Sequence, residues 1–448
     1  MVRAATARFD SLVLRILSYD ITSQGISFVT GVLIARVLGP AALGTLVLLQ
    51  IVPQYAEKFL RLGIDQASIY LGNGSKRETC LLYISSGIVL MSLVSIGAAG
   101  LFWMLREPFQ HALLKTILAS QWPIIVVTAT IPVAVVYRAV MWNLLQFEEI
   151  GLFTSLNNVV PTVLKVCGLV GVWVTGDILS ALVGYLLSVA IGVWGGIWFL
   201  RRQGVFSFTA VDFKIMKELA TTGFRQYAAT VAQFLHYRID IMLVGYFLLP
   251  AMAGLYSLAS NFAMILFRIP AAVTAIQFPR SVKAISEEEA RKFTTTLYKH
   301  TWIVLAALLA PTWGGVWMIT RFGLEVEFHA LLVPFSILLV ATIPMAISQI
   351  LTTHYFGRGK ASIPLLCIGL TLMINLVCNM LVIPSHGITG AGLVSLLTYS
   401  IAAGLLTICF VDTGAVLELW KPTRSDLKPY MHLLRRTISK INPGLAGA

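Results

Sequence analysis

Charged side chains lie inside long apolar stretches of this sequence, where a charge is costly unless it faces a partner or water. They are Asp20, Arg36, Glu57, Lys58, Arg61, Arg138, Lys165, Arg225, Arg238, Asp240 and Arg268. Most of them are basic, and an arginine guanidinium presents a planar fork of donors that matches a phosphate group. The pattern therefore favours a site for an anionic molecule.

The strongest candidates for contact with such a molecule are Arg36, Arg138 and Lys165, because they combine depth in an apolar stretch with positive charge. Arg61 and Arg238 complete the basic set, and Gln233 could hydrogen-bond a sugar hydroxyl. Arg61 could instead lie near a helix end and extend its charge to lipid headgroups.

Two aspartates are candidates for ion coupling, Asp20 and Asp240, with H⁺ or Na⁺ as the ion. Asp240 could equally be a structural partner of a cation. Arg238 and Asp240 are two residues apart and do not share a helix face, so each needs a partner on another helix.

The elements that position these residues are apolar helices. Hydrophobic residues make up 57% of the 448 residues and charged residues 12%, against about 25% charged in soluble domains. A helix needs about 20 apolar residues to cross a bilayer. Twelve segments qualify: 14–38, 42–63, 80–104, 122–145, 152–174, 178–200, 223–248, 252–278, 301–320, 329–352, 361–383 and 388–411. We expect an all-α integral membrane protein with about twelve transmembrane helices.

The charge outside these segments argues against other classes of protein. The net charge of +13 lies mostly between the apolar segments, as contact with anionic lipid headgroups requires, so nucleic-acid binding is not expected. The five cysteines lack metal-ligand spacing, and we expect no metal or cofactor. FGRGKAS (356–362) lacks the spacing of an ATP-binding phosphate loop.

Lysines and arginines also predict the orientation in the membrane. With a cytoplasmic N-terminus, only Arg106, Lys115 and Arg321 fall in segments on the opposite side, so both termini are expected in the cytoplasm. The longest cytoplasmic connections, 201–222 and 279–300, have amphipathic spacing and are expected to be helices at the interface. Ser286 and Glu289 have the spacing of a capping box for the second one.

An internal repeat relates the two halves of the sequence. At an offset of 210 residues, Pro40 aligns with Pro250 and Gly44 with Gly254. Each half would hold six helices and enter the membrane in the same direction, so a pseudo-twofold axis along the membrane normal should relate them. The predicted division is an N-terminal lobe (1–200), a cytoplasmic linker with an amphipathic helix (201–222), a C-terminal lobe (223–412) and a basic cytoplasmic tail (413–448).

Several motifs in order resemble one family of exporters. They are RVLGPAALGTLVL (36–48), RLGIDQASIY (61–70), YRIDIMLVGYFLLPAMAGLYSLA (237–259), IPAAVTAIQFPRSVKAIS (269–286) and IPSHGITGAGLVSLL (383–397). The chain resembles the multidrug/oligosaccharidyl-lipid/polysaccharide exporter superfamily, nearest to its polysaccharide-biosynthesis (Wzx-type) flippases. Two features depart from the family pattern: Asp20 in the first helix, and Tyr246 and Ala271 at the repeat equivalents of Arg36 and Arg61.

The resemblance implies a flippase that moves a polyprenyl-pyrophosphate-linked oligosaccharide across a bacterial inner membrane by alternating access. Its partners would be the lipid-linked glycan, membrane lipids and an ion such as H⁺ or Na⁺. A monomer is expected, which could work beside polysaccharide polymerase machinery. The function would belong to the biosynthesis of lipopolysaccharide or exopolysaccharide.

Other functions remain open on the sequence. The first is a cation-coupled multidrug exporter of the same superfamily, for which more acidic residues in the helices would be expected. A lipid II flippase is a narrower possibility. A membrane-embedded polymerase, ligase or glycosyltransferase is disfavoured because the longest predicted outside loop is only about 105–121. A channel or a scaffold would leave the duplication unexplained.

Overall fold

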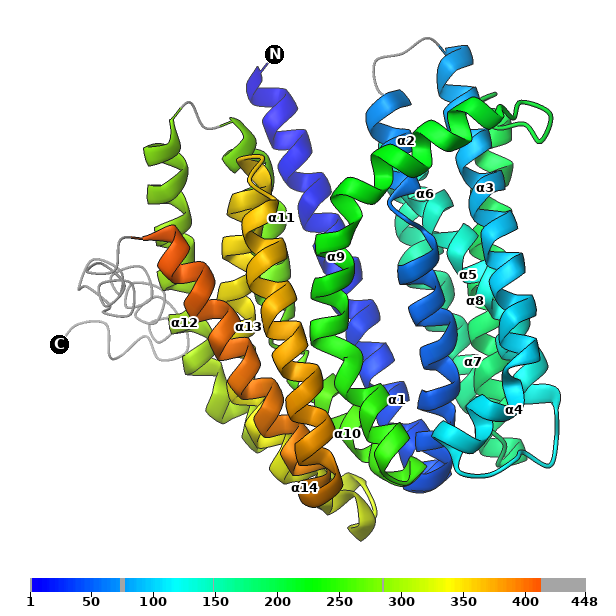
Figure 1. Ribbon diagram of the computed structural model, residues 1–448, viewed down its shortest axis with the longest axis vertical. Helices are drawn as coiled ribbons and strands as arrows, with labels where there is room; N and C mark the ends of the chain where they lie inside the picture. Colours follow the sequence, from blue (N-terminus) through cyan, green and yellow to red (C-terminus); the bar gives the residue numbers. More distant parts are fainter. Residues whose placement is uncertain (1, 73–76, 148, 284–285, 412–448) are drawn as a thin grey trace, which may run out of the picture. The chain divides into compact units, whose positions relative to one another are not determined.

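The computed structural model describes residues 2–72, 77–147, 149–283 and 286–411, with the side chains of 2–21 left aside. These residues form helices joined by short turns and contain no strand (Figure 1). In chain order the elements are α1 (Val2–Leu60), α2 (Ile64–Gly72), α3 (Arg77–Met104), α4 (Arg106–Phe109), η1 (Gln110–Leu114), α5 (Trp122–Gln146), α6 (Ile150–Thr154), η2 (Ser155–Val159), α7 (Val160–Thr175), α8 (Leu179–Arg202), α9 (Phe213–Phe247), α10 (Pro250–Ala263), α11 (Arg268–Lys283), α12 (Glu287–Met318), η3 (Ile319–Gly323), η4 (Val326–Leu331), α13 (Leu332–Gly357) and α14 (Ser362–Phe410).

Eight of the described helices are long and apolar enough to cross a membrane. A ninth span results if α10 and α11, which are bent by 51° at a short break, count as one. The chain is therefore an all-helical, multi-pass membrane protein. The predicted number of twelve is not reached by this criterion and stays a prediction.

The two longest helices each contain a break. Gly39 interrupts α1 with φ 71°, and Gly387 interrupts α14 with φ 57°. A positive φ strains any residue with a Cβ, and Pro40 directly after Gly39 cannot donate a backbone hydrogen bond. The breaks lie where the sequence separates segment 14–38 from 42–63 and segment 361–383 from 388–411.

Packing divides the chain into two units. The first comprises Met1–Leu258, Met318–Leu332 and Asn379–Ala391, and the second comprises Ala259–Trp317, Val333–Cys378 and Gly392–Ala448.

Each unit has its own apolar core. In the first, residues of α2, α3, α5, α8 and α9 pack together, and Figure 1 shows α5, α7 and α8 side by side. In the second, Tyr298, Leu351 and Leu406 bring α12, α13 and α14 into contact. The predicted lobe boundaries around 201–222 stay predictions, and the predicted tail lies outside the described residues.

The two amphipathic segments are helical only in part. Residues 213–222 form the start of α9 and residues 287–300 the start of α12, while 203–212 connect α8 to α9 without a helix. Their place at the membrane interface stays a prediction. Asp212 caps α9 by accepting a hydrogen bond from the backbone N–H of Lys214 at 2.7 Å. Ser286 accepts one from the N–H of Glu289 at 3.1 Å, as the predicted cap for α12 requires.

Two glycines that the sequence repeat pairs are in close contact within the first unit. A Cβ on Gly44 would lie 1.7 Å from the carbonyl oxygen of Pro250, and a Cβ on Gly254 would lie 2.6 Å from that of Pro40. Both obstructing atoms belong to the backbone, so neither can move aside as a side chain could. The turn after Gly39 and the turn before α10 therefore pack against each other through glycine.

Candidate functional site

The buried carboxylate of Glu57 organises the charges in the first unit. It lies near the end of α1 and is 7% exposed. Its Oε1 accepts hydrogen bonds from Nε of Arg138 at 3.0 Å and from Nζ of Lys58 at 3.3 Å. Arg138 comes from α5, so the ion pair joins two membrane helices. The Arg138 side chain is one-third exposed.

A second ion pair lies one turn further along the chain. Arg61 and Asp65 approach to 2.7 Å across the turn at Gly63, and their side chains are 5% and 1% exposed. Arg61 is predicted to bind substrate or to reach the headgroups, and in the structure it is buried and paired with a carboxylate. Its role in binding stays a prediction.

The end of α1 also contacts α9. The Tyr55 hydroxyl donates to the backbone carbonyl of Arg238 at 2.7 Å, and its ring packs edge-on against Phe234 at 5.1 Å between centroids. Nζ of Lys58 lies 5.9 Å from the centre of the same Phe234 ring. We call Glu57, Lys58, Arg61, Asp65 and Arg138 the charge cluster. It holds three cations and two carboxylates and so keeps one net positive charge.

The remaining basic candidates lie outside the charge cluster. Arg36 is exposed, in the last turn before the break at Gly39. Lys165 lies on α7 and is exposed. Its Nζ donates a hydrogen bond to the backbone carbonyl of Ser27 on α1 at 2.9 Å. Of the three leading candidates, the structure therefore places only Arg138 in the charge cluster.

Three predicted site residues lie on α9, and the side chains of Asp240 and Gln233 form hydrogen bonds there. Asp240 is buried and accepts a hydrogen bond from the hydroxyl of Tyr256 on α10, so its partner lies on another helix, as expected. Arg238 is half-buried. The amide of half-buried Gln233 donates to Tyr237 at 3.4 Å. Asp20 lies outside the described side chains.

Sequence reasoning missed Asp65 and did not assign Glu57 to the site. Asp65 follows Arg61 by four residues, a spacing that commonly forms ion pairs on helices. Glu57 was noted only as one of the charges inside an apolar stretch, because its partner on α5 lies 81 residues away and leaves no local signal.

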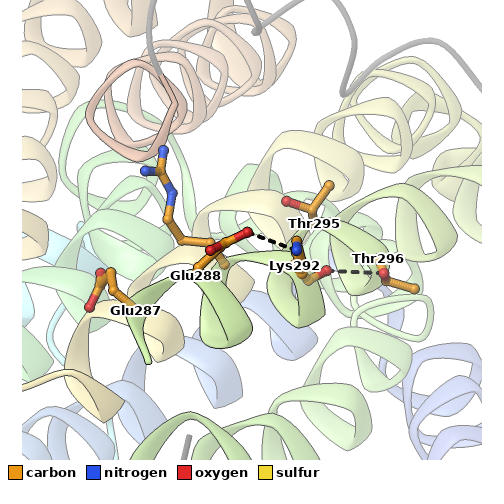
Figure 2. Close-up of a pocket in the computed structure, with 6 residues that line it drawn as sticks. Glu287, Glu288, Lys292, Thr295 and Thr296 are labelled. Carbon is orange, nitrogen blue, oxygen red and sulfur yellow. Dashed lines mark hydrogen bonds and ion pairs between the residues drawn. The ribbon is translucent and has the colours of Figure 1, made fainter. Parts of the chain in front are cut away.

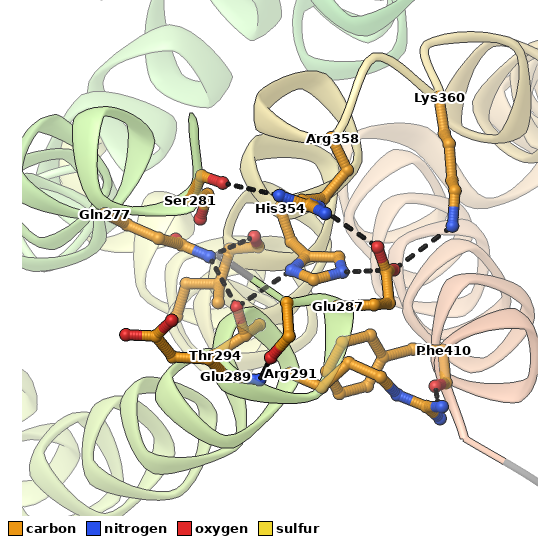
Figure 3. Close-up of polar contacts among 12 residues, drawn as sticks. Gln277, Ser281, Glu287, Glu289, Arg291, Thr294, His354, Arg358, Lys360 and Phe410 are labelled. Atoms are coloured by element: carbon orange, nitrogen blue, oxygen red, sulfur yellow. Dashed lines mark hydrogen bonds and ion pairs between the residues drawn. The ribbon is translucent and has the colours of Figure 1, made fainter. Parts of the chain in front are cut away.

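A separate network occupies the second unit (Figure 3). Glu287, in the first turn of α12, accepts from Nε of Arg358 at 3.0 Å and from Nζ of Lys360 at 3.1 Å. Nδ1 of buried His354 lies 3.0 Å from the Thr294 hydroxyl. These contacts tie α12 to the end of α13 and to the turn before α14.

A surface hollow of about 650 Å³ opens beside this network (Figure 2). Its lining comes from the first turns of α12, and its charged residues already have partners: Glu288 pairs with Lys292 at 2.8 Å with both side chains 76% exposed, and Glu287 belongs to the network above. An exposed pair of this kind is weak. We therefore interpret the hollow as a solvated helix face rather than a substrate site.

Sequence comparison identifies the family. The profile of the polysaccharide biosynthesis protein family matches residues 13–285, well over half of the chain. The chain belongs to this family. The family resemblance expected from the motifs, to the multidrug/oligosaccharidyl-lipid/polysaccharide exporter superfamily, is thereby confirmed. A search of curated protein sequences gives no significant match.

Solved structures show that the fold is that of flippases and multidrug exporters. The lipid II flippase MurJ in an inward closed conformation superposes with a TM-score of 0.72 at 14% identity, covering 91% of this chain and 90% of that one. An inward-facing multidrug resistance MATE family transporter of the MOP superfamily gives 0.70 at 12% identity, covering 92% and 99%. The Vibrio cholerae MATE transporter VcmN gives 0.58 at 16% identity, covering 90% and 96%.

Proposed function

We propose that this protein carries a polyprenyl-pyrophosphate-linked oligosaccharide across the bacterial inner membrane by alternating access, for the synthesis of a cell-surface polysaccharide. The family match and the fold make it a transporter of this superfamily. The observation that supports an anionic cargo is Arg138, a partly exposed arginine within a charge cluster of net positive charge. A pyrophosphate would compete with Glu57 for this guanidinium.

The arrangement that we propose for transport is twelve spans in two repeats of six. The breaks at Gly39 and Gly387 each divide one long helix into two segments that match the predicted spans. The reciprocal contact of Gly44 and Gly254 is consistent with a twofold axis between the repeats, because turns that lie on such an axis contact each other through equivalent residues. Both termini would lie in the cytoplasm, and both turns on the opposite side.

The test of function is movement of the cargo in vesicles. A fluorescent undecaprenyl-pyrophosphate glycan becomes a substrate for an added glycosidase when it reaches the outer leaflet. We expect protein-dependent cleavage, reduced about tenfold or more in Arg138→Ala. Arg321→Ala, which removes an exposed arginine outside the charge cluster, is the matched control and should transport normally. Normal transport by Arg138→Ala would remove this residue from the mechanism.

A second candidate is a cation-coupled exporter of small molecules. Buried Asp240, hydrogen-bonded to Tyr256, and the similarity to MATE transporters support it. The same vesicles distinguish the two, because an exporter of this type would release an organic cation in exchange for H⁺ or Na⁺ and leave the lipid-linked glycan in place. Loss of that exchange in Asp240→Asn would identify the coupling site.

A further inference from the structure

A groove in the first unit is lined by none of the residues of the charge cluster. It has a volume of about 620 Å³ and runs along α8 beside Val133 of α5. Its lining includes Val193, Ile197 and two tryptophans, Trp194 and Trp198. This volume falls within the range of about 300–1,000 Å³ found for ligand pockets.

The sequence of α8 explains how the groove forms. Glycines at 192, 195 and 196 allow α8 to approach α5 and η2 closely, since a Cβ on Gly196 would lie 2.1 Å from a methyl of Val140. The residues that line the groove recur at spacings of three and four, so they form one stripe beside the glycine face. The two bulky indoles project from it, with Trp194 72% and Trp198 46% exposed.

Two adjacent arginines close one end of the groove. Arg201 and Arg202 occupy the last turn of α8 and are exposed. The guanidinium of Arg202 lies 4.1 Å from the centre of the Trp198 ring, and that of Arg201 lies 4.9 Å from that of Phe208. Neither forms an ion pair with any carboxylate of the described residues. The aromatic rings hold both groups in place without neutralising them.

We propose that this groove binds an anionic phospholipid, with an acyl chain along Val133, Val193 and Ile197 and the phosphate at Arg201 and Arg202. Arginine pairs bind phosphate through charge-assisted hydrogen bonds, and tryptophans prefer the boundary between headgroups and hydrocarbon. A soluble phosphate would leave the apolar wall uncovered. The end of α8 lies on the predicted cytoplasmic side, where the leaflet is rich in anionic lipid. This site is distinct from that of the proposed cargo.

The test measures lipid binding to the purified full-length protein by native mass spectrometry after delipidation in a non-ionic detergent. We expect phosphatidylglycerol to bind about tenfold more tightly than phosphatidylcholine with the same acyl chains. The double substitution Arg201→Gln/Arg202→Gln should abolish this preference. The matched control Lys214→Gln/Lys217→Gln removes two exposed charges from the predicted same side and should retain it.

A second variant tests the apolar half of the site independently of charge. Ala190, which also lines the groove, is replaced by leucine to fill it while both arginines remain. We expect Ala190→Leu to weaken phosphatidylglycerol binding severalfold. Glycerol phosphate, which carries the headgroup charge without acyl chains, should not compete at millimolar concentration. Unchanged binding in the double arginine variant, equal affinity for the two lipids, or full competition by glycerol phosphate would each overturn the proposal.

Discussion

Arg61 and Asp65 form the most deeply buried ion pair in the described part of the first unit, and this burial determines how substitutions should behave. Removing one partner leaves a charge without compensation in a dry interior, which typically costs about 3–5 kcal/mol. We expect Asp65→Ala to lower the thermal unfolding temperature in detergent sharply. Arg61→Met/Asp65→Leu should recover most of the loss, because an apolar pair of similar volume leaves no charge behind.

The control for this pair is Glu327→Ala, which removes an exposed carboxylate of η4. It should change the unfolding temperature very little, since most exposed substitutions change stability by less than about 0.5 kcal/mol. If Asp65→Ala were as stable as Glu327→Ala, the pair would be surrounded by water rather than by packed side chains.

Glu57 should regulate access to Arg138. If cargo phosphate competes with Glu57 for this guanidinium, Glu57→Gln makes the arginine more available and raises affinity for the anion. We expect the fluorescent lipid-linked glycan to bind Glu57→Gln about tenfold more tightly in nanodiscs, while translocation slows because release is impeded. A purely structural role for Glu57 predicts the opposite, a loss of binding together with a loss of stability.

The residue types of the site could be predicted, but their pairing could not. Charge within apolar stretches drew attention to Arg61, Arg138 and Glu57, and the structure places all three in the charge cluster. Each was interpreted by its own depth and sign, and the oppositely charged partner was not considered. The Glu57–Arg138 contact joins residues 81 positions apart, so it depends on how α1 packs against α5 and has no local signature.

At the scale of elements, Glu287 connects α12 to the turn that joins α13 and α14. It accepts from both Arg358 and Lys360, whereas the adjacent Glu288 pairs only with Lys292 on its own helix. The side chain of Glu287 is 40% exposed, so solvent screens the interaction, and we expect a loss of about 1–2 kcal/mol for Glu287→Gln. Glu288→Gln is a matched control one residue away.

The measurement for this pair of variants is hydrogen exchange at the end of α13 together with thermal unfolding. Glu287→Gln should increase exchange around residues 354–360, because those backbone groups lose their link to α12. Glu288→Gln should leave exchange there unchanged. Equal behaviour of the two variants would show that the network in Figure 3 contributes nothing to holding these helices together.

The contact between the turns at Gly44 and Gly254 should control opening on the side opposite the predicted termini. Gly44→Ala places a methyl 1.7 Å from a backbone oxygen of Pro250, so the turns must separate. We expect a cysteine at position 43, where the native leucine is 7% exposed, to become several times more reactive toward an impermeant maleimide. Gly97→Ala is the control, because no atom lies within 4 Å of its added Cβ. Unchanged reactivity in Gly44→Ala would mean that this contact does not limit access.

The positions of the helices could be predicted, because the length of an apolar segment decides where a helix lies. The junctions between helices could be predicted only in part. Gly39-Pro40 marked the end of a segment correctly. The amphipathic segments 201–222 and 279–300 were expected to be helices at the interface, and residues 213–222 and 287–300 form the first parts of α9 and α12. Gly223 follows the amphipathic part of α9 and does not end the helix. A change from amphipathic to apolar spacing signals a change of environment and does not by itself end a helix.

For the whole molecule, the predicted repeat aligns one turn and not the charges. Positions 210 residues after Glu57, Arg61 and Arg138 are occupied by Phe267, Ala271 and Ser348. Pro40 and Gly44 have their counterparts in Pro250 and Gly254. We propose that a duplication supplies a symmetric framework for opening and closing, while the recognition of an anionic headgroup belongs to the first half alone.

The energy for transport should then depend on the membrane potential. Moving one negative charge outward across an inside-negative potential of 100 mV is worth about 2.3 kcal/mol, or roughly a 50-fold change in distribution per charge. In potassium-loaded vesicles with valinomycin, we expect the glycan to accumulate in the positive-side leaflet and to redistribute when the potential is collapsed. Arg138→Ala should slow the approach to this distribution and leave its final value unchanged, because a carrier residue alters rates and not the driving force. A distribution that follows an imposed H⁺ or Na⁺ gradient at zero potential would assign the driving force to ion coupling instead, with Asp240 as the first residue to replace.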